Sequence, residues 1–223
     1  MDAEFWHIRW RENRIAFHQG DTNKLLMKHW PAICPDENAT VFVPLCGKSV
    51  DMMWLAERGH TVIGVELSDV AIDAFFAENG LTPTHTEQDG FVIKSSGSIS
   101  LWCGDFFALE PRHLSAVSAV YDRASLIALP PELRQRYAAH MGRTLPKSAQ
   151  TLLLTITYDQ SEMNGPPFSV TTNEVQDIYG DWATVNHLET RDAFAGSQNL
   201  QERGVTAVTT SVYRLTAQTY TPS

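Results

Sequence analysis

Short apolar runs alternate with segments of helical periodicity along most of this chain. The apolar run 41–43 predicts a buried strand, Asp51 to Arg58 has apolar residues at helical spacing, and 61–65 predicts a second strand that ends at Glu66. A turn that contains Gly47 separates the first strand from the helix. This order of strand, tight turn, helix and strand is typical of the opening unit of an open α/β sheet.

The remaining pattern continues this alternation. It predicts helices over 4–18, 22–33 (with Asp21 or Thr22 as N-cap), 69–79, 131–145 and 173–179, a hairpin within 84–103, and strands over 117–121, 151–157, 184–189 and 205–215. The last two strands have no helix between them, which indicates an antiparallel finish to a mostly parallel sheet. We therefore expect one domain over residues 1–223, with a helical cap over 1–35 and an α/β core over 36–223.

The turn after the first predicted strand and the acid at the end of the second predict a nucleoside cofactor. Gly47 and Glu66 are 66 − 47 = 19 positions apart, the separation at which open α/β sheets place an acid on ribose hydroxyls. A dehydrogenase needs a turn with several glycines for its pyrophosphate, and this turn offers one. A P-loop needs glycine where Phe42 stands, so Gly47-Lys48-Ser49 does not indicate an ATPase. The alternative for Glu66 is a solvated acid.

Two further strand ends carry candidate ligand contacts. Asp105 and Phe106 follow the third strand, where an acid and an aromatic ring fit adenine; the alternative is a turn Asp before a core Phe. Arg123 stands at the end of the fourth strand, where open α/β sheets bind ligands. There it can face a ligand anion or a polarised heteroatom, or form a structural ion pair with Asp122.

Aromatic residues dominate the N-terminal segment. Trp6, Trp10 and Phe17 can form the core face of a helix, or they can close over a bound sulfonium, which ring faces attract. Trp10 and Phe17 are seven positions apart and share one face of the helix expected over 4–18. We therefore expect this helix to cap the cofactor.

The composition of the chain excludes several classes of binding partner. The net charge of −9 and the lack of a basic run argue against nucleic acid, and no apolar run has the length of a membrane span. The widely spaced Cys34, Cys46 and Cys103 support neither a disulfide framework nor a zinc site, and the histidines form no metal-binding motif. The charged N-terminus does not suit a signal peptide. We expect a monomeric cytoplasmic protein without a metal.

Six strings in order then show a family resemblance. They are Ala16-Phe-His-Gln, Val41-Phe-Val-Pro-Leu-Cys-Gly-Lys-Ser, Arg58-Gly-His-Thr-Val-Ile-Gly-Val-Glu, Ile99-Ser-Leu-Trp-Cys-Gly-Asp-Phe-Phe, Tyr121-Asp-Arg-Ala-Ser-Leu and Gly165-Pro-Pro-Phe-Ser-Val. The chain resembles the thiopurine S-methyltransferases, in particular the bacterial members. The resemblance implies the Rossmann-like fold of class I methyltransferases, with a mixed sheet, helices on both faces and an N-terminal helical cap.

The resemblance also implies a cofactor and a set of site residues. The cofactor is S-adenosylmethionine as methyl donor, and the matching cofactor positions are Trp10, Leu45, Gly47, Glu66, Asp105, Phe106 and Arg123. Phe17 faces the acceptor, with Arg123 as a second acceptor-side candidate. Some members carry another substrate-side arginine after an Asp-Ala-Phe string. Here a longer stretch separates Asp192-Ala-Phe from Arg203, which leaves the role of Arg203 and the acceptor preference open.

The function that follows is S-methylation of aromatic or heterocyclic thiols such as thiopurines, by in-line displacement at the methyl carbon. The resemblance extends this to selenium and tellurium compounds and to tellurite tolerance. An ionised sulfur is a good nucleophile, so positioning and desolvation can supply the rate without a dedicated base. Two alternatives remain open: a module that binds S-adenosylmethionine without turnover, and a methyltransferase for another small-molecule acceptor.

Overall fold

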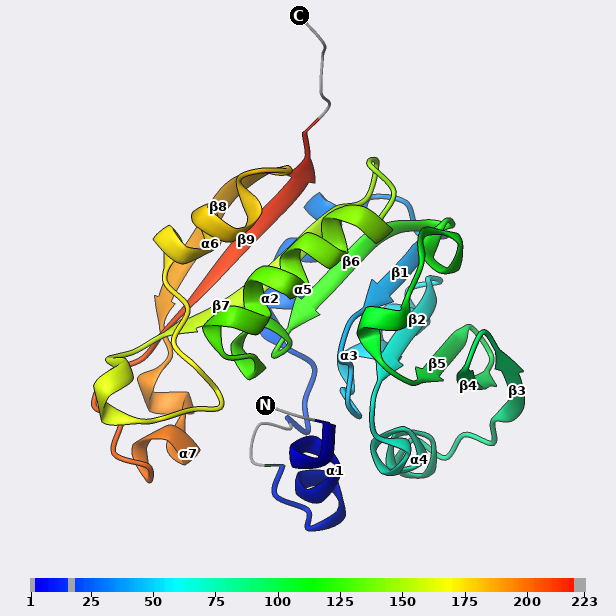
Figure 1. The fold of residues 1–223 in the computed structure, drawn as a ribbon, viewed down its shortest axis with the longest axis horizontal. Helices are drawn as coiled ribbons and strands as arrows, with labels where there is room; N and C mark the ends of the chain where they lie inside the picture. The colour runs from blue at the N-terminus through cyan, green and yellow to red at the C-terminus, as the bar shows by residue number, and fades with distance from the viewer. Residues whose placement is uncertain (1–2, 16–18, 219–223) are drawn as a thin grey trace, which may run out of the picture.

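The computed structural model describes residues 3–15 and 19–218, and its described strands form one nine-stranded sheet in the order β3-β4-β5-β2-β1-β6-β7-β9-β8 (Figure 1). The strands are β1 (Thr40–Val43), β2 (Thr61–Glu66), β3 (Thr84–Gln88), β4 (Phe91–Ser96), β5 (Ile99–Cys103), β6 (Val117–Arg123), β7 (Gln150–Thr157), β8 (Ala183–Asp192) and β9 (Thr209–Ala217). The five central strands, β5, β2, β1, β6 and β7, pair in parallel. The edges are antiparallel, because β4 pairs with β3 and β5 at one side and β9 pairs with β7 and β8 at the other.

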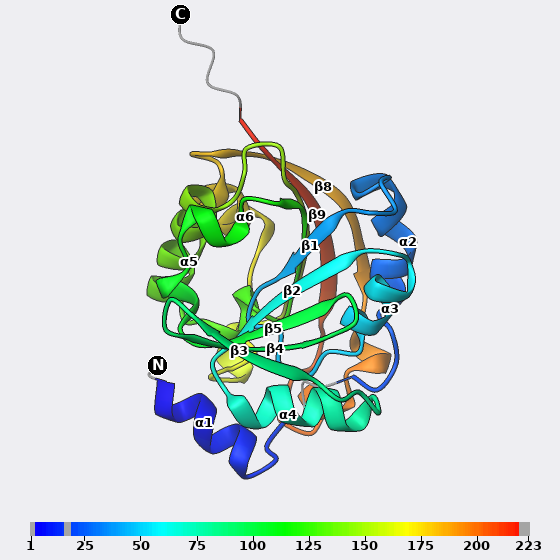
Figure 2. The same ribbon diagram turned by 90° about the vertical axis from the view of Figure 1, so that its right-hand side faces the viewer.

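Helices cover both faces of the sheet, as Figure 2 shows with the sheet turned on its side. They are α1 (Ala3–Arg11), α2 (Lys24–Ile33), α3 (Asp51–Glu57), α4 (Asp69–Glu78), α5 (Pro131–Thr144), α6 (Thr172–Tyr179) and the short α7 (Gln198–Gln201), with short 3-10 turns at Phe106–Ala108, Pro111–Leu114, Leu126–Ala128, Gln160–Glu162 and Phe194–Gly196. Strand β1 shows why two apolar layers form. Val41 and Val43 pack in the core with α2, α3 and α4, while Phe42 between them packs in the core with α5 and α6.

The expected fold class is confirmed, including the hairpin β8–β9 that closes the sheet. The described part of the chain contains no helix that is long and apolar enough to span a bilayer. The sequence reading missed β3, whose five residues are all exposed and give no apolar alternation. The N-cap of α2 is Asn23, whose side chain accepts hydrogen bonds from the backbone N–H groups of Leu25 and Leu26, rather than Asp21 or Thr22.

The first helix is shorter than expected. It was predicted over 4–18, but α1 ends at Arg11, and Asn13 adopts a left-handed conformation with φ of 53°. Asn tolerates this conformation better than other non-glycine residues and often follows the end of a helix. The helix of Trp10 therefore ends before the predicted boundary, and the prediction that Trp10 and Phe17 share a helix face involves a residue, Phe17, that lies outside the described residues.

A buried carboxyl group joins α5 to the sheet. Asp122 near the end of β6 accepts a hydrogen bond from the Tyr137 hydroxyl of α5 at 2.8 Å, and both side chains are buried. Burial raises the pKa of Asp122 from 3.8 to about 6, against the opposing effect of this hydrogen bond. The fold therefore favours the protonated form of Asp122.

Replacing Asp122 by Asn should stabilise the protein more at neutral than at acidic pH. Because the folded-state pKa lies above the unfolded-state value, the wild type loses free energy of unfolding as the pH rises from about 4 to about 6. Asn does not ionise and still offers an oxygen to Tyr137. The stability of the variant relative to the wild type should therefore rise by up to roughly 3 kcal/mol over this range.

Urea unfolding at several pH values measures this difference, with Asp181→Asn at an exposed carboxylate as the control. The prediction would be contradicted if the free energy of unfolding of Asp122→Asn, relative to the wild type, changed with pH as little as that of the control variant.

Candidate active site

A cavity of about 460 Å³ is lined by residues at or just after the carboxyl ends of β1, β2, β5 and β6, and by residues of α1. This is the position at which open α/β sheets bind their ligands. Seven residues predicted from the sequence line it together: Trp10, Leu45, Gly47, Glu66, Asp105, Phe106 and Arg123. Segments far apart in the sequence therefore meet at one place.

Glu66 forms part of the wall of this cavity at the end of β2. Its side chain is buried, and the two carboxylate oxygens accept hydrogen bonds from the backbone N–H groups of Gly47 and Ser68, each at 2.9 Å. Burial raises the pKa of Glu66, while these backbone hydrogen bonds lower it. Each oxygen has a second lone pair, so the carboxylate can still accept hydroxyl donors from a ligand.

The turn after β1 brings the backbone close to the N-terminal helix. Leu45 and Gly47 have φ values of 44° and 52°, and a Cβ atom added to Gly47 would lie 3.0 Å from the Trp10 ring. Only a residue without a side chain allows this contact without a shift of the ring. After β6, Ala124 is also left-handed, with φ of 65°. The strained non-glycine residues Leu45 and Ala124 both line the cavity, a typical location for backbone strain.

A buried carboxylate that sequence reasoning missed holds Arg123. Asp51, the first residue of α3, is fully buried, and its Oδ2 atom accepts hydrogen bonds from Arg123 Nε and the Tyr121 hydroxyl, both at 2.9 Å. Its Oδ1 atom accepts from the backbone N–H of Asn23 at 2.8 Å. Arg123 is thus paired with Asp51, and the alternative of an ion pair with Asp122 is wrong. An acid in the first turn of a helix was the available signal, but it is common there for other reasons.

Asp105 and Phe106 have structural contacts as well as places in the cavity wall. Asp105 is exposed and accepts a hydrogen bond from the backbone N–H of Phe107 at 2.9 Å, which caps the 3-10 turn after β5. The Phe106 ring stacks on that of Tyr137 with 4.8 Å between centroids. The alternative prediction, a turn Asp before a core Phe, therefore describes the local contacts of these two residues. Both residues also line the cavity.

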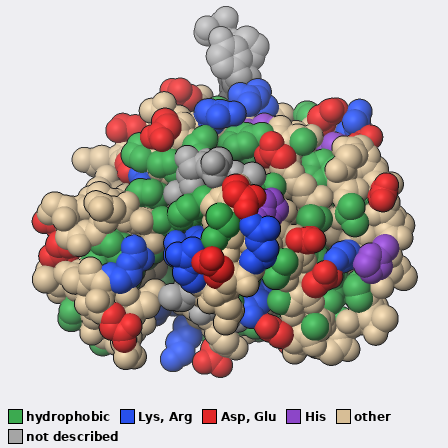
Figure 3. Space-filling model, turned by 60° about the horizontal axis from the view of Figure 1, so that its bottom comes forward, with side chains coloured by type: hydrophobic (Ala, Val, Ile, Leu, Met, Phe, Trp, Pro, Cys, Tyr) green, Lys and Arg blue, Asp and Glu red, His purple; other side chains and the backbone are tan. Residues whose placement is uncertain are grey.

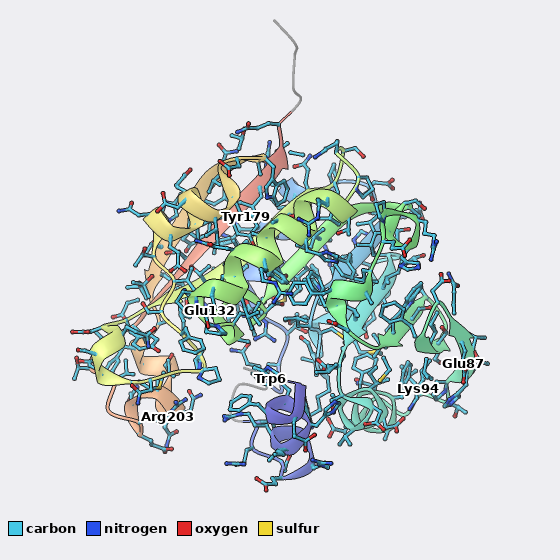
Figure 4. All side chains as sticks on the ribbon, viewed as in Figure 1. Trp6, Glu87, Lys94, Glu132, Tyr179 and Arg203 are labelled. Carbon is cyan, nitrogen blue, oxygen red and sulfur yellow. The ribbon has the colours of Figure 1, made fainter. Side chains whose placement is uncertain are left out.

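The cavity has further lining that the sequence did not single out. It includes Arg9, Phe107, Ile127, Leu129, Leu133, Arg136, Tyr137, Pro166 and Pro167; Trp6, named above with the N-terminal aromatic residues, also lines the cavity. Most of these side chains are apolar and come from α1, α5 and loops, whose placement depends on the tertiary fold. Arg203 donates from Nη1 to the carbonyl oxygen of Pro166 at 2.8 Å, beside the lining. Trp6 on α1 and Arg203 beside α7 both lie at the lower end of the molecule in Figure 4.

The chain is similar over nearly its whole length to known proteins of one family. A family model described as "Thiopurine S-methyltransferase (TPMT)" matches residues 1–218. A thiopurine S-methyltransferase of Pseudomonas fluorescens (strain Pf0-1) is 47% identical over 96% of this chain and 99% of that protein. One of Methylococcus capsulatus (strain ATCC 33009 / NCIMB 11132 / Bath) is 47% identical over 98% of this chain and 99% of that protein.

Solved structures show the same fold at low sequence identity. A 1,6-didemethyltoxoflavin-N1-methyltransferase of Burkholderia thailandensis, with bound 1,6-didemethyltoxoflavin and S-adenosylhomocysteine, superimposes with a TM-score of 0.62. The match covers 96% of this chain and 87% of that one, with 13% identity. At this identity the likeness concerns the fold alone.

Replacing Asp51 by Asn should destabilise the protein strongly. The variant keeps the size of the side chain but leaves the largely buried Arg123 without its counter-charge. Removing one partner of a buried ion pair costs roughly 3–5 kcal/mol. Tyr121→Phe is the matched control, because it removes one hydrogen bond to the same carboxylate at a cost of about 1 kcal/mol and leaves the charges in place. Urea unfolding measures both, and equal losses would contradict the prediction.

Proposed function

The chain belongs to the thiopurine S-methyltransferase family, and on this basis we propose that it methylates the sulfur of aromatic and heterocyclic thiols, thiopurines among them. It is an S-adenosylmethionine-dependent methyltransferase that acts on a small-molecule acceptor. When bound, S-adenosylmethionine supplies a methyl group on a positively charged sulfur. The acceptor sulfur takes this group by displacement at the methyl carbon.

The observation that carries the cofactor assignment is the position of Glu66. Its carboxylate is held by two backbone N–H groups at the cavity wall, and its remaining lone pairs suit the two hydroxyls of a ribose. The cavity volume of about 460 Å³ is in the range of small-molecule sites. The residues present therefore fit a nucleoside cofactor.

We assign the other predicted residues around this anchor. Asp105 and Phe106 would contact the adenine, the Leu45–Gly47 backbone the amino-acid part, and Trp10 the sulfonium, which a ring face attracts. Arg123, fixed by Asp51, would face the region between donor and acceptor. Phe17 remains a candidate on the acceptor side from the resemblance alone.

Apolar side chains form the part of the cavity that we assign to the acceptor. Phe107, Ile127, Leu129, Pro166 and Pro167 line it, and such side chains suit an aromatic or heterocyclic ring and exclude water from the reacting sulfur. A thiolate stripped of water reacts readily, so the protein's main contribution is to position and desolvate it.

The protein's own thiol at the cavity, Cys46, does not compete. Burial and the negative charge of Glu66 raise its pKa well above 9.0, so the thiol stays protonated. It also packs in the core with Val43 and Met52.

Incubation of the protein with S-adenosylmethionine and a panel of thiols, including 6-mercaptopurine and thiophenol, should give S-methyl products and S-adenosylhomocysteine. Adding selenium and tellurium acceptors tests the extension to those elements that the resemblance implies. Cofactor binding without any product across the panel would indicate a binding module and overturn the proposed function. Product from a different class of acceptor only would overturn the thiol assignment.

Glu66→Ala should weaken S-adenosylhomocysteine binding by at least roughly tenfold, because hydrogen bonds to a charged group contribute about 1.5–3 kcal/mol each. Isothermal titration calorimetry measures the dissociation constant, and circular dichroism checks that the variant is folded. Glu57→Ala, an exposed acid on α3 outside the cavity lining, is the matched control. An unchanged dissociation constant for Glu66→Ala would show that this carboxylate does not hold the ribose.

A further inference from the structure

We propose that the acceptor carries a carboxylate or similar anionic group beside its thiol, and that Arg136 and Arg9 bind this group at the mouth of the cavity. The inference rests on the proposed function and narrows the class of thiol that the site accepts. It follows from the charged side chains in the cavity lining, because an uncharged aromatic thiol would need only the apolar ones.

Most charged groups in the cavity lining already have an assigned partner. Lys48 Nζ lies 2.6 Å from a carboxylate oxygen of Glu78, and Arg123 is paired with Asp51. Glu66 is held by backbone N–H groups and faces the ribose in the proposed function. Of the cations in the lining, Arg9 and Arg136 remain, and neither forms an ion pair with any described residue; Asp105 is an exposed carboxylate in the same lining.

Arg136 projects from α5 at the edge of the cavity. It is exposed, and its guanidinium carbon lies 4.9 Å from the centroid of the Phe107 ring, which also lines the cavity. Stacking on an aromatic face holds the planar guanidinium while leaving its N–H groups free to bind an anion. An aromatic acceptor in the cavity would thus have a fixed cation at its outer end.

Arg9, on α1, also lines this cavity. Its Nε atom is buried and has no hydrogen-bond partner among the described residues. Burial, together with the positive charges of Arg14 and Arg203, lowers the pKa of Arg9. Arg14 is already paired with Glu12, at 2.5 Å, whereas Arg9 has no described acidic partner, so an anion bound to Arg9 would offset its repulsion from Arg14 and Arg203.

Arg9 and Arg136 are cations in an acidic chain. The net charge is −9, and on the face shown in Figure 3 several Lys and Arg side chains lie near the middle, with acidic side chains among them. A local field of opposite sign to the net charge attracts anions to the cleft and repels cations. The donor adds a sulfonium to this region, so an anionic acceptor complements both the site and its cofactor.

A matched pair of thiols tests the inference: 3-mercaptobenzoate and 3-mercaptobenzamide, which differ chiefly in charge. We expect kcat/KM for the benzoate to exceed that for the benzamide by about tenfold, the contribution of one charge-assisted hydrogen bond. Arg136→Gln and Arg9→Gln should each remove most of this preference through a higher KM for the benzoate, with the benzamide little changed. Arg136→Lys should restore part of it.

Arg143→Gln is the matched control, since Arg143 lies two turns further along α5, is exposed, and does not line the cavity. It should leave the preference unchanged. Calorimetry supplies a readout without turnover: benzoate should bind the complex with S-adenosylhomocysteine more tightly than benzamide does, and Arg136→Gln should abolish the difference.

The outcomes separate this inference from the proposed function. Equal kcat/KM for the two thiols would overturn the inference and leave thiol methylation intact, whereas no product from either, or from the wider thiol panel, would overturn the proposed function. If Arg136→Gln and Arg9→Gln instead weaken binding of S-adenosylhomocysteine, these arginines bind the carboxylate of the cofactor and the inference is wrong.

Discussion

The buried carboxylate of Asp51 is the interaction on which the site depends. It has no exposure to solvent, so its charge is tolerated only because Arg123, Tyr121 and the backbone of Asn23 surround it with donors. These groups come from the end of β6 and from the start of α2, and Asp51 itself begins α3. One carboxylate therefore fixes the positions of two helix starts and a strand end around the cavity, and it holds the Arg123 guanidinium in one orientation.

The turn between β1 and α3 is the second constraint. Two of its residues are left-handed, and Glu66 of the neighbouring strand accepts a hydrogen bond from the Gly47 backbone. Because β1 and β2 are adjacent parallel strands, this turn and this acid must meet at the same edge of the sheet. The missing side chain at Gly47 then admits the Trp10 ring, so the N-terminal helix is seated on the turn that the cofactor would contact.

Charged and apolar side chains line the same cavity. The cavity lining combines the acids Glu66 and Asp105, apolar rings and prolines, and two arginines without described acidic partners, Arg9 and Arg136. In a chain of net charge −9, this distribution arises from where α1 and α5 end up in the fold rather than from any basic run in the sequence.

The sequence by itself determined the alternation of strands and helices, the closing hairpin, and the spacing of Gly47 and Glu66, because local periodicity and turn residues encode these features directly. It did not determine that Asp51 pairs with Arg123, which lies 72 positions away, or that Arg9 and Arg136 line one cavity. It also placed the end of the first helix wrongly, and it missed the polar edge strand β3. Those features were decided by tertiary structure, since ion pairs, cavity walls and edge pairing depend on contacts between segments that local pattern does not relate.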